Sequence, residues 1–188
     1  MNIFKFALFV FLLGHTNYSF SQEKDQVGTD TKKPKNETKY SEVVNTDSVR
    51  ASELLKRAVN WVKSENVKYD KTNGVTTADK AECFAKFTIK PKELNPECDY
   101  AGTVTLKVVV ECKDNKYRYT INQIKHISKS GKTTGGSIDN IVPECGSIVM
   151  SDLIWKKVRG ECIKCATAIT SDLKEAMLLD SKQPADEW

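Results

Sequence analysis

Gly102-Thr103-Val104-Thr105-Leu106-Lys107-Val108-Val109-Val110-Glu111-Cys112, residues 102–112 (GTVTLKVVVEC), is the most regularly patterned stretch of the sequence. Apolar side chains recur there at every second position, at Val104, Leu106, Val108, Val110 and Cys112. A period of two is that of a β-strand, in which successive side chains point to opposite faces of the sheet. We therefore predict a strand with one buried face. Its solvent face carries Thr103, Thr105, Lys107, Val109 and Glu111.

Two further strands flank this one. Residues 81–89 alternate in the same way and place Cys83, Ala85, Phe87 and Ile89 on one face. After a turn at Asp114-Asn115, residues 116–127 form the partner strand, with Tyr117, Tyr119 and Ile121 inward. The alternation slips near Ile124, which predicts a β-bulge or fraying there.

The remaining segments predict two helices and two more strands. Residues 40–44 form a short β-type run, a strand starts at residues 67–69, and Asn73-Gly74 is a strong turn pair. A helix follows Ser52, which can cap it, and a second follows Ser151-Asp152, with Gly160 able to interrupt it. Their apolar stripes are Leu54, Leu55, Ala58, Val59, Trp61 and Val62, and Ile154, Val158, Cys162, Cys165, Ile169, Leu173 and Ala176.

The predicted order is β-α-β-β-β-β-α, which defines an α+β domain over residues 40–180. An antiparallel sheet needs only one covered face, and two amphipathic helices suffice to cover it. Residues 128–150 are rich in Gly, Ser, Thr and Lys and predict a long loop with a short ordered piece around residues 138–142. Residues 181–188 read as a loose tail.

The N-terminal segment has the layout of a secretory signal peptide. Lys5 precedes the apolar run at residues 6–13, and Ser19-Phe20-Ser21 places small residues where a signal peptidase cleaves. We expect residues 1–21 to be removed and the protein to be exported, to the periplasm or the cell exterior. The polar residues 22–39 predict a disordered leader. No later segment is apolar enough to predict a transmembrane span.

Several of these stretches together resemble a family of exported bacterial proteins, a domain of unknown function with a fold like that of the TATA-box-binding protein (TBP-like). The residues that carry the resemblance are 40–44 (YSEVV), 52–61 (SELLKRAVNW), 102–106 (GTVTL), 116–121 (KYRYTI) and 172–177 (DLKEAM). The resemblance implies a curved antiparallel sheet with both helices packed on one face, and an envelope location. It implies no activity.

Six cysteines, an even number, favour disulfides in an exported chain. The predicted pairing of strands 81–89 and 102–112 brings Cys83 towards Cys112. Cys98 and Cys145 are expected at the opposite end of that strand pair, with Cys162 as a rival partner for Cys98.

Cys162-Ile163-Lys164-Cys165 permits two other interpretations. A CxxC pair that opens a helix after a strand is typical of thiol–disulfide enzymes, and this hypothesis requires Gly160 to start a new helix. Alternatively, Cys83, Cys112, Cys162 and Cys165 could bind zinc as four thiolates. The oxidising compartment and the helical stripe favour structural or buried cysteines instead.

Motifs typical of hydrolases and phosphate-binding loops are missing from the sequence, and His126 is expected to be a surface side chain at a strand end. The formal net charge of +4 comes from interleaved Lys and Glu, so no nucleic-acid partner is predicted. The leading hypothesis is a non-enzymatic binding or structural module without cofactor, metal or catalytic residues, whose partner is an envelope protein or glycan. Its contact surface is either the 128–150 loop or the exposed sheet face with Thr103, Thr105, Lys107, Arg118 and Thr120.

Overall fold

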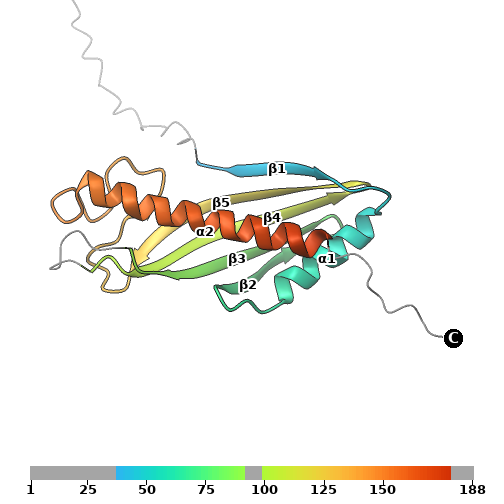
Figure 1. Cartoon of the computed structure of the whole chain (residues 1–188), viewed down its shortest axis with the longest axis horizontal. Helices are drawn as coiled ribbons and strands as arrows, with labels where there is room; N and C mark the ends of the chain where they lie inside the picture. The colour runs from blue at the N-terminus through green and yellow to red at the C-terminus, as the bar shows by residue number, and fades with distance from the viewer. Residues whose placement is uncertain (1–36, 92–98, 179–188) are drawn as a thin grey trace, which may run out of the picture. The chain divides into compact units, whose positions relative to one another are not determined.

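The computed structural model describes residues 37–91 and 99–178 (Figure 1). The predicted signal peptide (1–21), residues 22–36 of the predicted leader, Cys98 and the predicted tail (181–188) lie outside the described residues. Glu37 and Thr38, the first described residues, already contact the domain. The Glu37 carboxylate accepts the backbone N–H of Gln123 at 2.9 Å, and Asp139 accepts that of Thr38 at 3.0 Å. The contacts of the domain therefore begin three residues before Tyr40.

The described residues form the predicted element order with one small addition. The elements are β1 (Tyr40–Asn45), α1 (Ala51–Lys63), β2 (Asp70–Thr76), β3 (Lys80–Ile89), β4 (Gly102–Lys113), β5 (Lys116–Ser128), β6 (Gly136–Ser137) and α2 (Asp152–Leu178). The addition is β6, a two-residue strand that lies just before the ordered piece predicted around residues 138–142.

The strands form one antiparallel sheet in the order β1-β5-β4-β3-β2, and β6 pairs with β5. The first strand of the chain therefore lies beside β5, while β2 to β5 are joined consecutively. Figure 1 shows β1 along one edge and β2 along the other. The predicted α+β class and the antiparallel sheet are confirmed.

Both helices pack on the same face of this sheet (Figure 1), where they enclose the core. Leu54 and Ala58 of α1 are fully buried, as are Val158 and Leu173 of α2. Gly160 does not interrupt α2, which is continuous over 27 residues. On β4 the predicted inward residues are all buried: Val104, Leu106, Val108, Val110 and Cys112. Neither helix in the described ranges has an apolar stretch long enough to cross a bilayer.

The predicted irregularity in β5 is a β-bulge. Thr105 faces Lys125 across the β4–β5 ladder, whereas Lys107 faces Asn122, so β5 contains one extra residue in this interval. Gln123 adopts a positive φ of 53° there. The bulge restores the alternation, since Ile124 and His126 on its far side point into the core again.

Two local predictions, the cap of α1 and the turn at Asn73-Gly74, are wrong because contacts with distant segments determine the structure at both places. Ser52 does not cap α1; the carboxylate of Asp114, in the β4–β5 turn, accepts the backbone N–H of Ala51 at 2.8 Å instead. Asn73-Gly74 is not a turn but lies inside β2, next to a register shift. A Cβ atom at Gly74 would come within 2.9 Å of the Glu82 Cβ, so glycine allows the two strands to approach closely here.

The predicted long loop between β5 and α2 packs closely onto the end of the sheet. Its Gly135 lies against the indole ring of Trp155, which would be 2.1 Å from a Cβ atom at that position. The Trp155 indole N–H donates to the carbonyl of Asn140 at 2.9 Å. His126 is fully buried beneath the loop and its Nδ1 accepts the N–H of Gly135 at 3.2 Å, so the prediction of a surface histidine is wrong.

Candidate functional site

The side of the sheet opposite the two helices, here called the open face, carries all five predicted contact residues. Thr103, Thr105 and Lys107 alternate with buried residues along β4, and Arg118 and Thr120 do so along β5. The β4–β5 register places them on one face: Val109 and Glu111, which continue the outward row of β4, face Thr120 and Arg118 of β5. The structure therefore brings these side chains into two neighbouring rows.

A carboxylate that sequence reasoning missed lies at the centre of the open face. Glu82 of β3 forms ion pairs with Lys80 and Lys107, both at 2.8 Å. Only 8% of Glu82 is exposed, and Gly74 packs against it. Hydrogen bonds from Lys107 and Lys80 lower the pKa of Glu82 below its usual value. The pair was not predictable because Glu82 and Lys107 meet only when the register of β3 on β4 is known.

The other cations predicted on the open face are also engaged. Arg118 pairs with Glu111 across the β4–β5 ladder at 2.8 Å. The Lys107 ammonium also lies 5.9 Å from the centre of the Phe84 ring, within range of a cation–π interaction. The open face is therefore a mixed surface of hydroxyls, balanced ion pairs and a partly exposed aromatic ring.

A shallow cavity of about 390 Å³ lies at the Arg118 end of the open face. Its lining residues come from β1, β4, β5 and the turn before β3: Val43, Asp79, Glu111, Cys112, Lys113, Lys116, Tyr117 and Arg118. Three cationic and two carboxylate side chains contribute to this lining, so its charge is nearly balanced.

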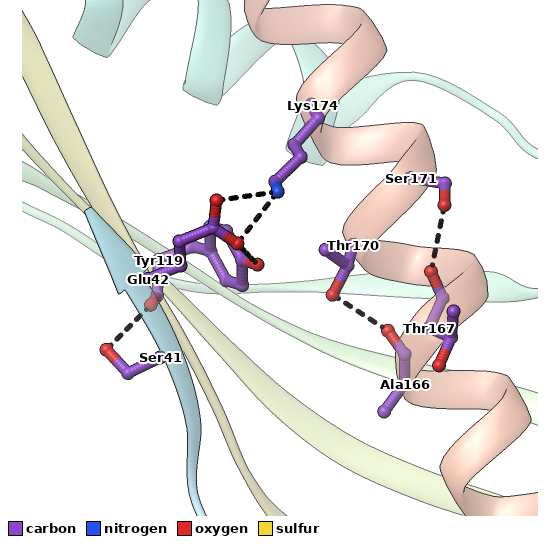
Figure 2. A network of polar contacts seen from close by, with 8 residues as sticks. All are labelled: Ser41, Glu42, Tyr119, Ala166, Thr167, Thr170, Ser171 and Lys174. Atoms are coloured by element: carbon purple, nitrogen blue, oxygen red, sulfur yellow. Dashed lines mark hydrogen bonds and ion pairs between the residues drawn. The ribbon is translucent and has the colours of Figure 1, made fainter. Parts of the chain in front are cut away.

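On the helix side, a charged network fastens the edge strand β1 to α2. Figure 2 shows Glu42 of β1 between Tyr119 of β5 and Lys174 of α2. The Lys174 ammonium donates to both carboxylate oxygens of Glu42, at 2.8 and 2.7 Å, and the Tyr119 hydroxyl donates to one of them at 2.6 Å. The hydrogen bond from Lys174, followed by that from Tyr119, lowers the pKa of Glu42. This network holds structural elements together and leaves no unengaged acid or base.

A second network ties α1 and β2 to α2 through one carboxylate. Asp172 accepts the indole N–H of Trp61 at 2.7 Å, the side-chain amide of Asn66 at 3.2 Å, and the hydroxyl of Tyr69. Burial, and next the hydrogen bond to Asp172, raises the pKa of Tyr69. The Lys71 ammonium donates to the Trp61 carbonyl and lies 4.6 Å from the centre of its ring. Neutral donors therefore satisfy this acid.

Five of the six cysteines lie in the described residues, and no disulfide joins any two of these five. The predicted Cys83–Cys112 pair is wrong. Cys83 faces Val108 in the β3–β4 ladder, while the N–H of Cys112 donates to the carbonyl of Asp79. Cys112 is thus four residues further along β4, about 13 Å at the rise of a strand. Disulfides need Cα atoms within about 7 Å.

The Cys98–Cys145 pair remains a prediction, since Cys98 lies outside the described residues. Its neighbour Asp99 accepts the Thr133 hydroxyl at 2.7 Å through its backbone carbonyl. The backbone N–H of Cys145 donates to the carbonyl of Thr134 at 3.0 Å. Asp99 and Cys145 therefore contact two adjacent residues of the same loop, Thr133 and Thr134.

The CxxC pair does not have the setting that the redox hypothesis requires. Cys162 lies ten residues after Asp152, the first residue of continuous α2, so the pair does not open the helix, and both thiols are buried. Burial raises the pKa of Cys162 to about 12 and that of Cys165 to about 11. Reactive thiols have lowered pKa values, because the thiolate is the nucleophile. These thiols therefore resemble core side chains.

The four cysteines considered for zinc do not come together. Burial raises the pKa of Cys83 to about 12 and that of Cys112 to about 11, whereas metal binding needs thiolates. Over residues 37–91 and 99–178, no group of three or more His, Cys, Asp or Glu side chains is placed to hold a metal ion. The described cysteines instead contribute to the core.

Comparisons with known proteins find similarity to a family of unknown function and to two solved structures. Residues 40–126 match a family described as "Domain of unknown function (DUF4468) with TBP-like fold". A TBP-like protein from Parabacteroides distasonis ATCC 8503 is similar in structure, with a TM-score of 0.52 and 15% identity over 77% of this chain and 94% of that chain. A DUF4468 family protein from Bacteroides ovatus ATCC 8483 is also similar in structure, with a TM-score of 0.54 and 11% identity over 79% of this chain and 90% of that chain. No curated protein matches. At these identities the structural likeness concerns the fold alone.

Proposed function

We propose that this chain, whose residues 40–126 form a DUF4468 domain with the TBP-like fold, is an exported, non-enzymatic binding or structural module of the bacterial cell envelope. It would work in the periplasm or at the cell exterior and would contact its partner through the open face. The signal-peptide pattern of residues 1–21 supports export.

The observation that carries this proposal is the preformed ion pairing of an open sheet face. Two long strands, β4 and β5, run through its centre, and no described helix covers it. Two of its charged side chains are already held by partners within the sheet, Lys107 by Glu82 and Arg118 by Glu111. A surface whose side chains are fixed before binding loses little conformational entropy when a partner docks.

The chemistry of the open face favours a protein partner over a glycan. Sugar rings stack on exposed aromatic side chains, and among the described strands Phe84 is the one aromatic residue on this face. The Lys107 ammonium already lies over its ring. Hydroxyls, balanced ion pairs and partly exposed Val43 and Ile127 suit the mixed polar and apolar contacts of protein interfaces.

The titratable groups of the described residues support a binding role rather than catalysis. Glu42 and Asp172 are occupied in hydrogen-bond networks that join elements. The thiols of Cys83 and Cys162 have pKa values raised to about 12 by burial. Catalytic groups usually show shifts towards the working pH and lie in a cleft.

The proposal can be tested by photo-crosslinking in the producing bacterium. A photoreactive phenylalanine analogue is placed at Thr105, in the centre of the open face, or at Val43, beside its cavity. The control position is Thr167, which is exposed on α2 on the opposite side of the domain. Substitution at these positions leaves the ion pairs of Glu82 and Glu111 intact. Lys107→Glu is unsuitable, because it would place a second carboxylate next to Glu82 and disturb the sheet itself.

The expected result is a discrete crosslinked product from positions 105 and 43 and none from position 167. Thr105→Arg, which adds bulk and charge, should abolish the product formed from position 43. Crosslinks from position 167 alone, or no product from either open-face position, would exclude the open face as the contact surface. Recovery of the protein only from the cytoplasm would exclude the exported role.

A further inference from the structure

A group of exposed aliphatic side chains lies between β6 and the first turn of α2. We call it the loop patch, and it consists of Ile141, Val142, Ile148, Val149 and Leu153. Ile148 is fully exposed, at 103%, and Ile141 is 88% exposed. These 5 residues are among the 12 exposed large hydrophobic residues of the described chain, yet they fall within 13 consecutive positions. Scattered exposed hydrophobic residues need no explanation, but a cluster marks a contact surface.

The exposure of the loop patch does not result from poor packing of the loop. The same segment buries Ile138, Met150 and Trp155 in the core. The Tyr100 hydroxyl donates to the carbonyl of Val149 at 3.2 Å. The backbone N–H of Met150 donates to the carbonyl of Gly146 at 3.0 Å. The loop is thus fixed by one set of apolar side chains and presents a second set that the fold does not use.

Basic side chains lie next to the loop patch in the sequence. Lys156 and Lys157 lie three and four residues after Leu153 on α2, and Lys129 and Lys132 lie in the connection from β5 to β6. All four lysines are exposed, and none has an ion-pair partner among the described residues. This contrasts with Lys107 of the open face, which is paired with Glu82.

We propose that the loop patch inserts into the surface of a lipid bilayer, with the adjacent lysines bound to anionic headgroups. Protein interfaces are enriched in aromatic residues, Met and Arg and require complementary shape. The patch is purely aliphatic, and none of its residues lines the cavity at the Arg118 end of the open face or the cavities beside Gly160 and Asn115. Acyl chains require no shape complementarity, and lysines beside an apolar surface favour anionic lipid.

The test is vesicle co-sedimentation of the protein recovered from its native compartment, so that it carries the N-terminus that the cell leaves on it. Vesicles of equal parts phosphatidylglycerol and phosphatidylcholine are compared with pure phosphatidylcholine, at low and high salt. Binding to the anionic vesicles at low salt is expected, with a clear fall at high salt because screening weakens the lysine contribution.

Two double variants separate the apolar and the charged contributions. Ile141→Ser/Ile148→Ser should lower the partition coefficient about tenfold or more. Val67→Ser/Val75→Ser is its control, since both valines are exposed elsewhere on the domain. Lys156→Glu/Lys157→Glu should lower binding about fivefold or more per lysine. Its control is the pair Lys63→Glu/Lys68→Glu, which is exposed near the end of α1.

Three results would overturn the proposal: no binding to anionic vesicles, equal binding to pure phosphatidylcholine, or unchanged binding of the isoleucine variant. Concentration-dependent self-association that the isoleucine variant loses, without vesicle binding, would also overturn it and assign the patch to a second copy of the chain. The crosslinking test probes the open face, so either proposal can fail without the other.

Discussion

The two faces of the sheet hold a carboxylate in contrasting ways. On the helix side, neutral donors from Trp61, Asn66 and Tyr69 satisfy Asp172. On the open face, the lysines 80 and 107 satisfy Glu82. Both acids join elements that are distant in the sequence, but only the second does so through opposite charges.

This difference determines how each side should respond to its surroundings. Hydrogen bonds from buried neutral groups depend little on salt, and removal of their acceptor leaves the donors unsatisfied. Ion pairs at the surface weaken in salt and disappear when the acid is protonated. The Asp172 network should therefore stabilise the fold with little dependence on salt, whereas the Glu82 ion pairs should respond to salt and pH.

The largest effect is expected from Asp172→Ala. The indole N–H of Trp61 and the hydroxyl of Tyr69 would lose their acceptor inside the protein, at a loss of about 2–4 kcal/mol in the free energy of unfolding. Urea unfolding at low and high salt measures this, and the loss should be the same at both. Glu175→Ala, at an exposed site on the same helix, should change stability by less than about 0.5 kcal/mol. An equally small loss in Asp172→Ala would show that the network is dispensable.

A smaller, salt-dependent loss is expected from Lys107→Met. Methionine keeps apolar contact with Phe84 but leaves Glu82 with one lysine, at a loss of about 1–2 kcal/mol. The difference from the unmodified protein should shrink at high salt, and Lys107→Arg should retain most of the stability. A salt-independent loss would mean that packing, not charge, dominates at this position.

Acidification should destabilise the domain in two separate pH ranges. Burial lowers the pKa of His126 below its ordinary value of 6.5, so the unfolded chain binds the proton more readily and stability falls as the pH drops below 6.5. The lowered pKa of Glu82 adds a second loss as the pH falls below 4.5. His126→Gln should remove the first phase in urea unfolding followed from pH 8 to about pH 3. Glu82→Gln should reduce the second phase without removing it, because the pKa of Glu42 is also lowered. A single phase that neither variant changes would contradict both assignments.

The smallest effect is expected from Arg118→Met. Its ion pair with Glu111 is largely exposed, with side-chain exposures of 54% and 40%, so the loss should be below about 0.5 kcal/mol. This variant therefore serves in binding experiments on the open face without a change in stability. A loss above about 1 kcal/mol in the free energy of unfolding would mean that the pair is less exposed to solvent than the structure shows.

The sequence predicted features that repeat locally. The alternation in 102–112 gave the buried and polar faces of β4, and the slip near Ile124 marked the bulge at Gln123. The apolar stripes of both helices were predicted because a helical period is visible within a few turns. The placement of the five contact residues on one face followed from the same alternation.

Features that depend on distant segments were missed or wrong. The Cys83–Cys112 pair failed because alternation gives the face of a strand but not its register against the next strand. The ion pair of Glu82 with Lys107 was not predicted for the same reason. The capping role fell to Asp114 instead of Ser52, and burial of His126 required the following loop to fold back over the sheet.

The sequence alone determined the element order, the inward face of each long strand and the helical stripes, because side-chain periodicity follows from backbone geometry within each element. Only the tertiary structure decided which charges meet, which thiols are buried and which apolar side chains remain exposed. Those properties depend on strand register and on how a loop packs, and both result from the packing of the whole domain rather than from any local pattern.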